Sequence, residues 1–269
     1  MVSPKVRMLV GDDSKVVHTL FADIVEKWSK PITMLSAYNG RQCVAQLEQG
    51  RVDLAFIDVS MPEMNGMEAI ARMRYAGDRT FVTLMSGQGS DIRFQLARYL
   101  RTYEFLVKPF RPDDVRRILA IHQRVSLPTR VVIVDDSATV RRMVKRILAN
   151  SMFNMQVAEA GNGEDALVMC ASGGFDILFL DYNMPGLNGL ETLAGLLSRN
   201  PYAKIIMMSG ARDDALAKEA LARGALEFLH KPFFPREIDR VLHMAYDLIP
   251  PMLDDVSDGD FPKLPPLPV

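Results

Sequence analysis

The chain has 269 residues, enough for two domains of ordinary size, and its 48% apolar and 24% charged residues are typical of a globular protein. No uncharged apolar stretch reaches the roughly 18 residues of a membrane span, and the first residues lack a signal-peptide pattern, so we expect a cytoplasmic protein without membrane insertion. The net charge of −1 argues against nucleic-acid binding through overall charge, and two isolated cysteines exclude a disulfide framework.

The first element in the chain is the apolar run MLVG at residues 8–11, which ends in two adjacent aspartates, Asp12 and Asp13. This pattern indicates a buried strand that stops at the acids. Two carboxylates in contact repel each other, so the pair is costly unless a positive group lies beside it. We therefore expect a cation at the end of this strand.

The same string returns 123 residues later as VVIVDDS at residues 131–137, and most of the first half returns with it. The stretch IDVSMPEMNGMEAI aligns with LDYNMPGLNGLETL, and EFLVKPFRP aligns with EFLHKPFFP. A repeat of this length is a duplicated domain and not a solenoid unit. We predict one domain over residues 1–124, a linker over 125–129, a second domain over 130–246, and a disordered Pro- and Asp-rich tail over 247–269.

Within each copy, short apolar runs alternate with longer amphipathic stretches. In the second copy the short runs are RVVIV (130–134), MQVAEA (155–160), FDILFLD (175–181), KIIMMS (204–209) and EFLHK (227–231). Buried strands fit these runs best, although MQVAEA is assigned from its position alone. Five strands that alternate with five helices predict a parallel sheet covered on both faces, which is a doubly wound α/β fold.

Polar residues stand at the ends of four of these strands. In the second copy they are Asp135, Asp136, Asp181, Ser209 and Lys231, and their counterparts in the first are Asp12, Asp13, Asp58, Ser86 and Lys108. Because parallel strands open on one edge of the sheet, these side chains should converge on one pocket. Three carboxylates favour magnesium, the lysine and hydroxyl suit phosphate oxygens, and a carboxylate can itself be a nucleophile for a phosphoryl group.

The acid pair, the loop D-x-x-M-P-x-x-x-G, the serine and the K-P-F motif together resemble the receiver domains of two-component response regulators. The resemblance covers residues 5–123 and 128–246. It implies two flavodoxin-like (βα)5 domains in tandem with Mg²⁺ as cofactor. It also implies cis peptide bonds before Pro109 and Pro232, which would aim the preceding lysines.

The resemblance also assigns roles. Asp58 and Asp181 correspond to phosphoacceptors, Asp13 and Asp136 to direct metal ligands, and Asp12 and Asp135 to neighbours that act mainly through water. The carbonyls of Ser60 and Asn183 would complete the metal shell. Lys108 and Lys231 would pair with the phosphoryl group, Ser86 and Ser209 would hold it, and Phe105 and Phe228 occupy the position of a rotating aromatic switch. A packed core aromatic is an equally good interpretation of both phenylalanines.

The two copies differ in two places. The first has Ser60 where the second has Asn183, which faces the attacking water in the family, so the two phospho-aspartates should hydrolyse at different rates. The first also has Arg101 and Thr102 where the second has the family's usual Gly224 and Ala225. This departure puts in doubt whether the first domain's signalling face moves in the usual way, and it leaves the pocket intact.

The resemblance implies a tandem-receiver response regulator and not an enzyme. A histidine kinase or histidine phosphotransfer protein would donate the phosphoryl group, an unknown downstream protein would take the output, and a homodimer or an intramolecular pseudo-dimer of the two domains is plausible. Two alternatives stay open: the receiver pair of a larger diguanylate cyclase, and a phosphate sink without direct output. A haloacid-dehalogenase-type phosphatase fits poorly, because its nucleophile lies in D-x-D after the first strand, whereas here the motif is D-D-S.

Overall fold

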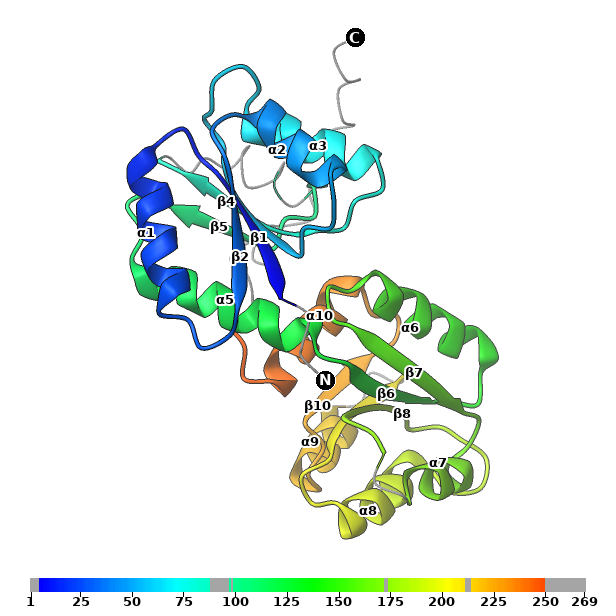
Figure 1. Cartoon of the computed structure of the whole chain (residues 1–269). Helices are drawn as coiled ribbons and strands as arrows, with labels where there is room; N and C mark the ends of the chain where they lie inside the picture. Colours follow the sequence, from blue (N-terminus) through cyan, green and yellow to red (C-terminus); the bar gives the residue numbers. More distant parts are fainter. Residues whose placement is uncertain (1–4, 88–96, 98, 172–173, 211–213, 250–269) are drawn as a thin grey trace. The chain divides into compact units, whose positions relative to one another are not determined.

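The computed structural model describes residues 5–87, 97, 99–171, 174–210 and 214–249. The chain divides into two compact units, one that runs to His122 and one that begins at Gln123 (Figure 1). Each unit holds one five-stranded parallel sheet. Most of the expected tail lies outside the described residues, and so do residues 88–96 and 98 between β4 and β5 of the first unit.

The first sheet has the strand order β2-β1-β3-β4-β5, which is the doubly wound arrangement. Its elements are β1 (Val6–Gly11), α1 (Lys15–Glu26), β2 (Ile32–Ala37), α2 (Gly40–Glu48), β3 (Leu54–Asp58), α3 (Gly66–Tyr75), β4 (Phe81–Ser86), β5 (Glu104–Val107) and α5 (Pro112–Ser126).

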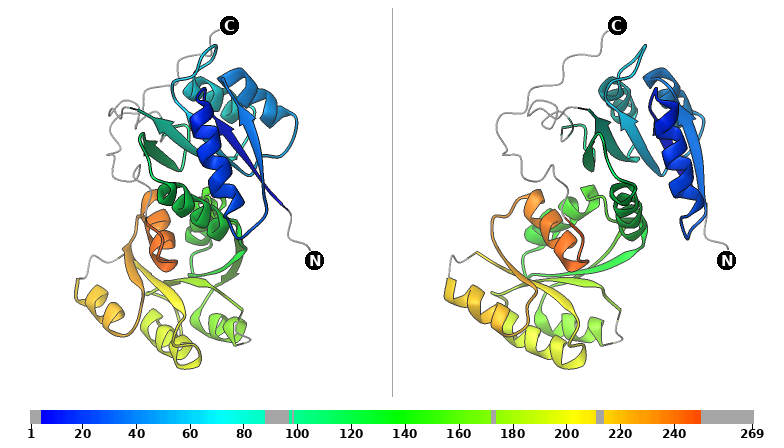
Figure 2. Two further views of the ribbon diagram at one scale, coloured as in Figure 1. Left: turned by 60° about the vertical axis from the view of Figure 1, so that its left-hand side comes forward. Right: turned by 90° about the vertical axis from the view of Figure 1, so that its left-hand side faces the viewer.

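The second sheet repeats this order as β7-β6-β8-β9-β10. Its elements are β6 (Thr129–Val134), α6 (Ala138–Asn150), β7 (Met155–Ala160), α7 (Gly163–Cys170), β8 (Ile177–Asp181), α8 (Gly189–Arg199), β9 (Lys204–Ser209), α9 (Asp214–Ala222), β10 (Glu227–His230) and α10 (Pro235–Ala245). Figures 1 and 2 show α6 and α10 on one face of this sheet and α7 and α8 on the other. The predicted strands and the doubly wound class are confirmed, including the weak run MQVAEA.

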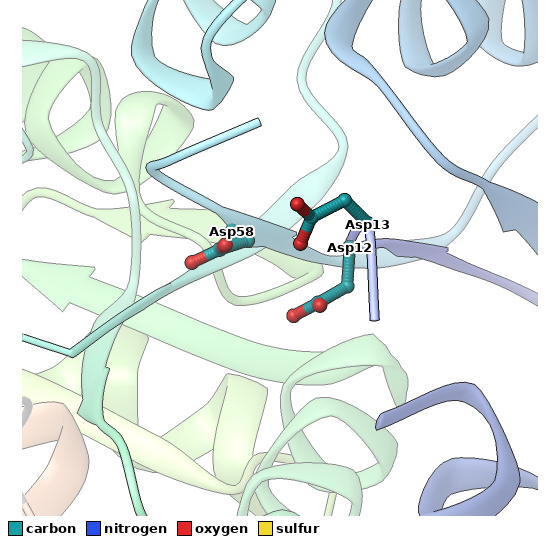
Figure 3. A group of neighbouring side chains, drawn as sticks. All are labelled: Asp12, Asp13 and Asp58. Carbon is teal, nitrogen blue, oxygen red and sulfur yellow. The ribbon is translucent and has the colours of Figure 1, made fainter. Parts of the chain in front are cut away.

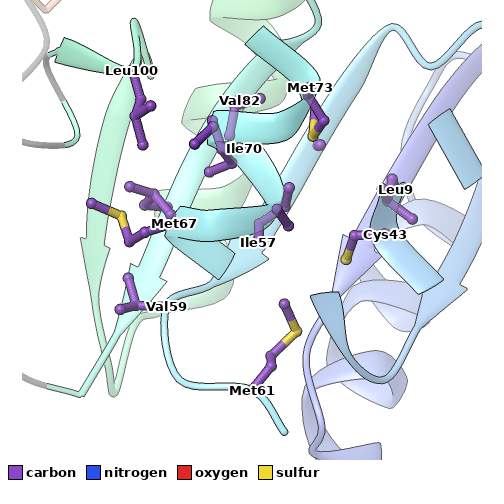
Figure 4. Packing of buried hydrophobic residues seen from close by; sticks show 14 of the residues in the cluster. Leu9, Cys43, Ile57, Val59, Met61, Met67, Ile70, Met73, Val82 and Leu100 are labelled. Carbon is purple, nitrogen blue, oxygen red and sulfur yellow. The ribbon is translucent and has the colours of Figure 1, made fainter. Parts of the chain in front are cut away.

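Strand residues alternate between two cores because successive side chains point to opposite faces. Leu9 and Ile57 pack in one hydrophobic cluster with Cys43 of α2 and Ile70 of α3, and none of these four side chains is exposed to solvent (Figure 4). On the other face, Phe56 lies with its ring centroid 4.8 Å from that of Phe21 on α1. The sheet is therefore buried on both sides, as its continuous apolar runs indicate.

The expected linker, residues 125–129, overlaps two elements of the structure. Helix α5 continues through Ser126 and β6 begins at Thr129, so only Leu127 and Pro128 separate them. The helix extends this far because Val125 is buried, with 2% exposure, and its carbonyl accepts a hydrogen bond from the Asn154 amide at 2.9 Å.

His122 on α5 should make the first unit sensitive to acid. Its ring is buried, packs edge-on to Phe81 at 5.3 Å, and bonds to the backbone of Asp53, and burial lowers its pKa. The unfolded chain therefore binds a proton at higher pH than the folded chain does, so stability falls as the pH drops through the ordinary histidine range near 6.5. We expect the urea midpoint, followed by the fluorescence of Trp28, to fall between pH 7.5 and 5.5, and to fall less in His122→Gln. An equal fall in both proteins would contradict this assignment.

Candidate functional site

The polar residues singled out in the sequence meet at the carboxyl edge of each sheet. Asp58 is the last residue of β3, Ser86 is the last of β4, and Asp12 and Lys108 directly follow β1 and β5. These four strands are neighbours in the sheet, so their ends lie side by side. The backbone amide of Lys108 donates to the carbonyl of Ser86 at 2.7 Å, and Lys231 repeats this bond to Ser209 at the same distance.

Three carboxylates gather in each pocket. Asp12, Asp13 and Asp58 each offer one oxygen, and these oxygens lie within 4.8 Å of one another (Figure 3). The second unit holds the same group in Asp135, Asp136 and Asp181. In both groups the second acid of the pair is exposed, and the other two carboxylates are buried. Each pocket therefore opens to solvent on the side of the exposed acid.

One lysine ammonium lies between two of the carboxylates in each pocket. Lys108 Nζ is 2.6 Å from Asp12 Oδ2 and 3.2 Å from Asp58 Oδ1. Lys231 Nζ makes the same contacts in the second unit, at 2.5 Å to Asp135 and 2.8 Å to Asp181. The peptide bond after each lysine is cis, as the resemblance implies.

The lysine does not offset all the negative charge. Burial raises the pKa of Asp58 and that of Asp181; the lysine opposes this shift, and Asp12 or Asp135 adds to it. Like charges held in a site of low dielectric constant favour either a bound cation or a proton. With three carboxylates facing one ammonium, each pocket is electrostatically suited to a divalent ion with oxygen ligands.

The loop M-P-x-x-N-G explains how the acceptor aspartate is held. Asn65 caps α3 by accepting a hydrogen bond from the Glu68 amide at 2.9 Å, and Asn188 caps α8 in the same way. At Gly66 an added Cβ would lie 2.0 Å from the carbonyl oxygen of Asp58, so the helix start packs directly on the acceptor's backbone. Glycine at this position is therefore a geometric requirement of the pocket.

The sequence did not reveal the side chains that hold the acid pair from behind. His18 Nε2 donates to the Asp12 carbonyl at 2.8 Å, and its ring lies 4.5 Å from that of Tyr38. Arg141 stands at the aligned position in the second unit, where it donates to the carbonyls of Asp135 at 2.7 Å and Asp136 at 3.3 Å. A lone histidine or arginine on an amphipathic helix suggests a surface residue. The sequence offered one signal of this role, because His18 and Arg141 both lie six residues after the first acid of their pair.

The remaining predicted residues lie around the pocket. Ser60 and Asn183 are exposed in the loops after the acceptors, and the Ser60 amide donates to the Asp58 carboxylate. Ser86 and Ser209 are buried at their strand ends. Phe105 and Phe228, at 1% and 7% exposure, belong to the hydrophobic clusters beneath the last strands. Both phenylalanines are thus core residues in this structure, and a switching role stays a prediction.

Comparison with known proteins agrees with this geometry. The model of the response regulator receiver domain matches residues 8–120 and again residues 131–243. The chain belongs to this family. It carries two receiver domains in tandem, each with the flavodoxin-like fold.

Individual receiver proteins match one domain at a time. The chemotaxis protein CheY of Listeria monocytogenes is 40% identical over 113 residues, which are 42% of this chain and 92% of that protein. The cyclic di-GMP phosphodiesterase response regulator RpfG of Xanthomonas campestris is 36% identical over 119 residues, 43% of this chain and 31% of its own length. The matched region therefore makes up nearly the whole of one relative and less than a third of the other.

A solved structure matches both receiver domains together. It is the crystal structure of a two-component system response regulator/GGDEF domain protein, with a TM-score of 0.64 over 91% of this chain and 99% of that chain. At 21% identity this likeness shows the fold alone. Within the part of the chain that the structure describes, no helix has the length and apolar character needed to cross a membrane.

Proposed function

We propose that this protein is a two-component response regulator whose two receiver domains each accept a phosphoryl group, on Asp58 and on Asp181. The donor is the phosphohistidine of a histidine kinase or a phosphotransfer protein in the cytoplasm. The observation that carries the proposal is the meeting, in both domains, of three carboxylates with one lysine ammonium at the carboxyl edge of the sheet.

The donor set fits magnesium. Asp13 and Asp58 would bind the ion directly in the first domain, with the carbonyl of Ser60 beside them and Asp12 acting through water, and Asp136, Asp181, Asn183 and Asp135 would do the same in the second. Carboxylate and carbonyl oxygens in small number, with room for water, are what Mg²⁺ selects. When bound, the ion supplies positive charge that stabilises the phosphoryl group during transfer.

The chain's own residues supply the remaining chemistry. A carboxylate oxygen of Asp58 attacks phosphorus, the new O–P bond forms as the N–P bond to the donor imidazole breaks, and the imidazole keeps the electron pair. Lys108 leaves its contact with the Asp12 and Asp58 carboxylates to pair with a phosphoryl oxygen, and the Ser86 hydroxyl donates to another. Output then depends on contact with a downstream protein, without a further catalytic step in these two domains.

Labelling with acetyl phosphate tests the proposal without a known kinase. The protein is incubated with acetyl phosphate and magnesium, and its intact mass is measured after rapid acid quenching. We expect a species that carries two phosphoryl groups, because both pockets hold the complete residue set. A mass that never changes, at any concentration of donor, would overturn the proposal.

Magnesium should raise the melting temperature of the protein. A ligand at one hundred times its dissociation constant stabilises the folded state by about 2.7 kcal/mol, which corresponds to several degrees. We expect this increase to disappear in the double variant Asp13→Asn, Asp136→Asn and to persist in Asp23→Asn, which changes an exposed acid on α1. An equal magnesium response in all three proteins would place the ion elsewhere.

A further inference from the structure

The segment that leads into the last strand has the same backbone course in both domains. We call residues 99–103 and the aligned residues 222–226 the pre-strand corner. The Thr102 amide donates to the Ala97 carbonyl at 3.0 Å, and the Ala225 amide donates to that of Ala220 at 3.0 Å. The corner of each domain is then tied to the sheet by the amide of its last residue, Tyr103 or Leu226.

The corner requires a left-handed residue at one position. Gly224 has φ +100° there, which costs glycine little because it has no Cβ. Arg101 takes the same position in the first domain with φ 51°, a conformation that is unfavourable for a residue with a side chain. The first domain therefore needs additional interactions to keep its corner in this conformation.

Arg74 on α3 provides these interactions. Its Nε donates to the Leu100 carbonyl at 2.8 Å and its Nη2 to that of Arg101 at 3.2 Å, which are two successive carbonyls of the corner. The same guanidinium donates to the carbonyls of Asp78 and Thr80, both at 2.9 Å, in the loop between α3 and β4. The Arg74 side chain is only 15% exposed, and its bonds to Leu100, Asp78 and Thr80 are partly buried, whereas its bond to the Arg101 carbonyl is exposed to solvent.

The second domain lacks this chemistry. Leu197 stands at the aligned position of α8 and has no donor, and its Cδ1 lies 2.9 Å from where a Cβ on Gly224 would be. The second corner also lacks a hydroxyl group that the first one has. Thr102 Oγ1 donates to the Ala97 carbonyl at 2.9 Å, whereas the aligned residue in the second domain is Ala225. The first domain therefore differs from the second at two contacting places. It has Arg101 and Thr102 in place of Gly and Ala in the corner, and it has Arg74 in place of a leucine on the helix beside the corner.

We propose that Arg74 is a clamp that holds the pre-strand corner of the first receiver domain in one arrangement, while the second domain keeps a corner that opens readily. The corner leads directly into β5, which carries Phe105 and ends next to Lys108 of the phosphoacceptor pocket. The consequence for signalling, that the second domain's corner is the one that responds to phosphorylation, rests on the proposed function. The clamp itself does not.

Amide hydrogen exchange of the full chain, resolved by NMR, tests the clamp. The Thr102 and Ala225 amides make equivalent bonds of equal length, so their protection factors compare the two corners directly. We expect the Thr102 amide to be protected about tenfold more than the Ala225 amide. The reason is that the charged Arg74 guanidinium bonds to the carbonyls beside Thr102, and hydrogen bonds to charged groups are stronger than those between neutral groups. Arg74→Leu should remove this difference and leave Ala225 unchanged. Arg72→Leu, which changes a half-exposed arginine on the same helix that pairs with Glu68, is the control.

The amides of β1 serve as a reference for global stability, and the fall at Thr102 is measured relative to theirs. Should Arg74→Leu not fold, Arg74→Lys keeps the charge but lacks the planar fork that reaches several carbonyls, and it must lower the protection of Thr102 as well. Equal protection of Thr102 and Ala225 in the unmodified chain, or an unchanged Thr102 in the folded Arg74 variant, would overturn the clamp.

A second arm adds beryllofluoride with magnesium, which mimics a phosphoryl group on an aspartate. In the unmodified chain we expect chemical shifts to change at both pockets, and at the second corner more than at the first. In Arg74→Leu we expect the chemical shifts of the first corner to change as well. If neither pocket responds, the proposed function fails and the clamp stands on the exchange result. If both pockets respond and both corners shift equally in the unmodified chain, the consequence for signalling is overturned.

Discussion

Asp58→Asn and Asp181→Asn should each remove one of the two phosphoryl groups that the chain takes from acetyl phosphate, and the double variant should take none. An amide lacks the charged oxygen that attacks phosphorus, so the loss at each site should exceed a hundredfold. Intact mass gives the number of groups per chain, and fragmentation locates them. The controls Asp113→Asn and Asp214→Asn change exposed helix-terminal acids and should leave two groups in place.

The stability of the same variants shows whether labelling is lost because the acceptor is missing or because the protein is unfolded. Burial raises the pKa of both acceptors, because desolvation destabilises the charged form of each carboxylate. Replacing one by an amide should therefore raise the free energy of unfolding by about 1 kcal/mol, as for other functional charges. A double variant that melts normally and still incorporates two groups would show that acceptance occurs at other residues.

Gly66→Ala should destabilise the first domain by about 3 kcal/mol, the upper end of the cost of overpacking a core. The new Cβ would lie 2.0 Å from the Asp58 carbonyl oxygen and 2.8 Å from Ile57 Cγ2. The backbone of β3 cannot yield, because it is paired on both sides with β1 and β4. Whatever shift relieves the clash also displaces the acceptor, so phosphorylation of Asp58 should fall together with stability.

Urea unfolding followed by Trp28, the only tryptophan in the chain, measures this loss in the first domain. Gly87→Ala is the matched control, because no atom of the described residues lies within 4 Å of the Cβ that it would add. The reciprocal change Gly189→Ala would bring a Cβ to 2.5 Å from the Asp181 carbonyl oxygen and should impair labelling of Asp181 while leaving Asp58 reactive. A Gly66→Ala protein with the urea midpoint of the control would contradict the close packing described here.

The fold was predictable because short apolar runs indicate its strands and because the same pattern occurs in both halves of the chain. Strand runs such as residues 177–180 are continuous and apolar, which is typical of strands in a sheet covered on both faces. The weak strand Met155–Ala160 was placed by its position between helices, because the polar residues Gln156 and Glu159 interrupt its apolar pattern. The meeting of Asp12, Asp58 and Lys108 followed from strand order alone, since parallel strands share one edge.

Three kinds of contact were identified from the folded chain. His18 and Arg141 hold the carbonyls behind the acid pair, Gly66 packs on the acceptor's backbone, and Arg74 reaches the pre-strand corner. Each depends on a side chain or a missing side chain meeting a backbone oxygen from another element, and carbonyl positions have no sequence signature. Periodicity and spacing determined which elements form and which edge holds the charge. The tertiary structure alone decided which backbone groups those side chains reach, including the carbonyls through which Arg74 sets the first receiver domain apart from the second.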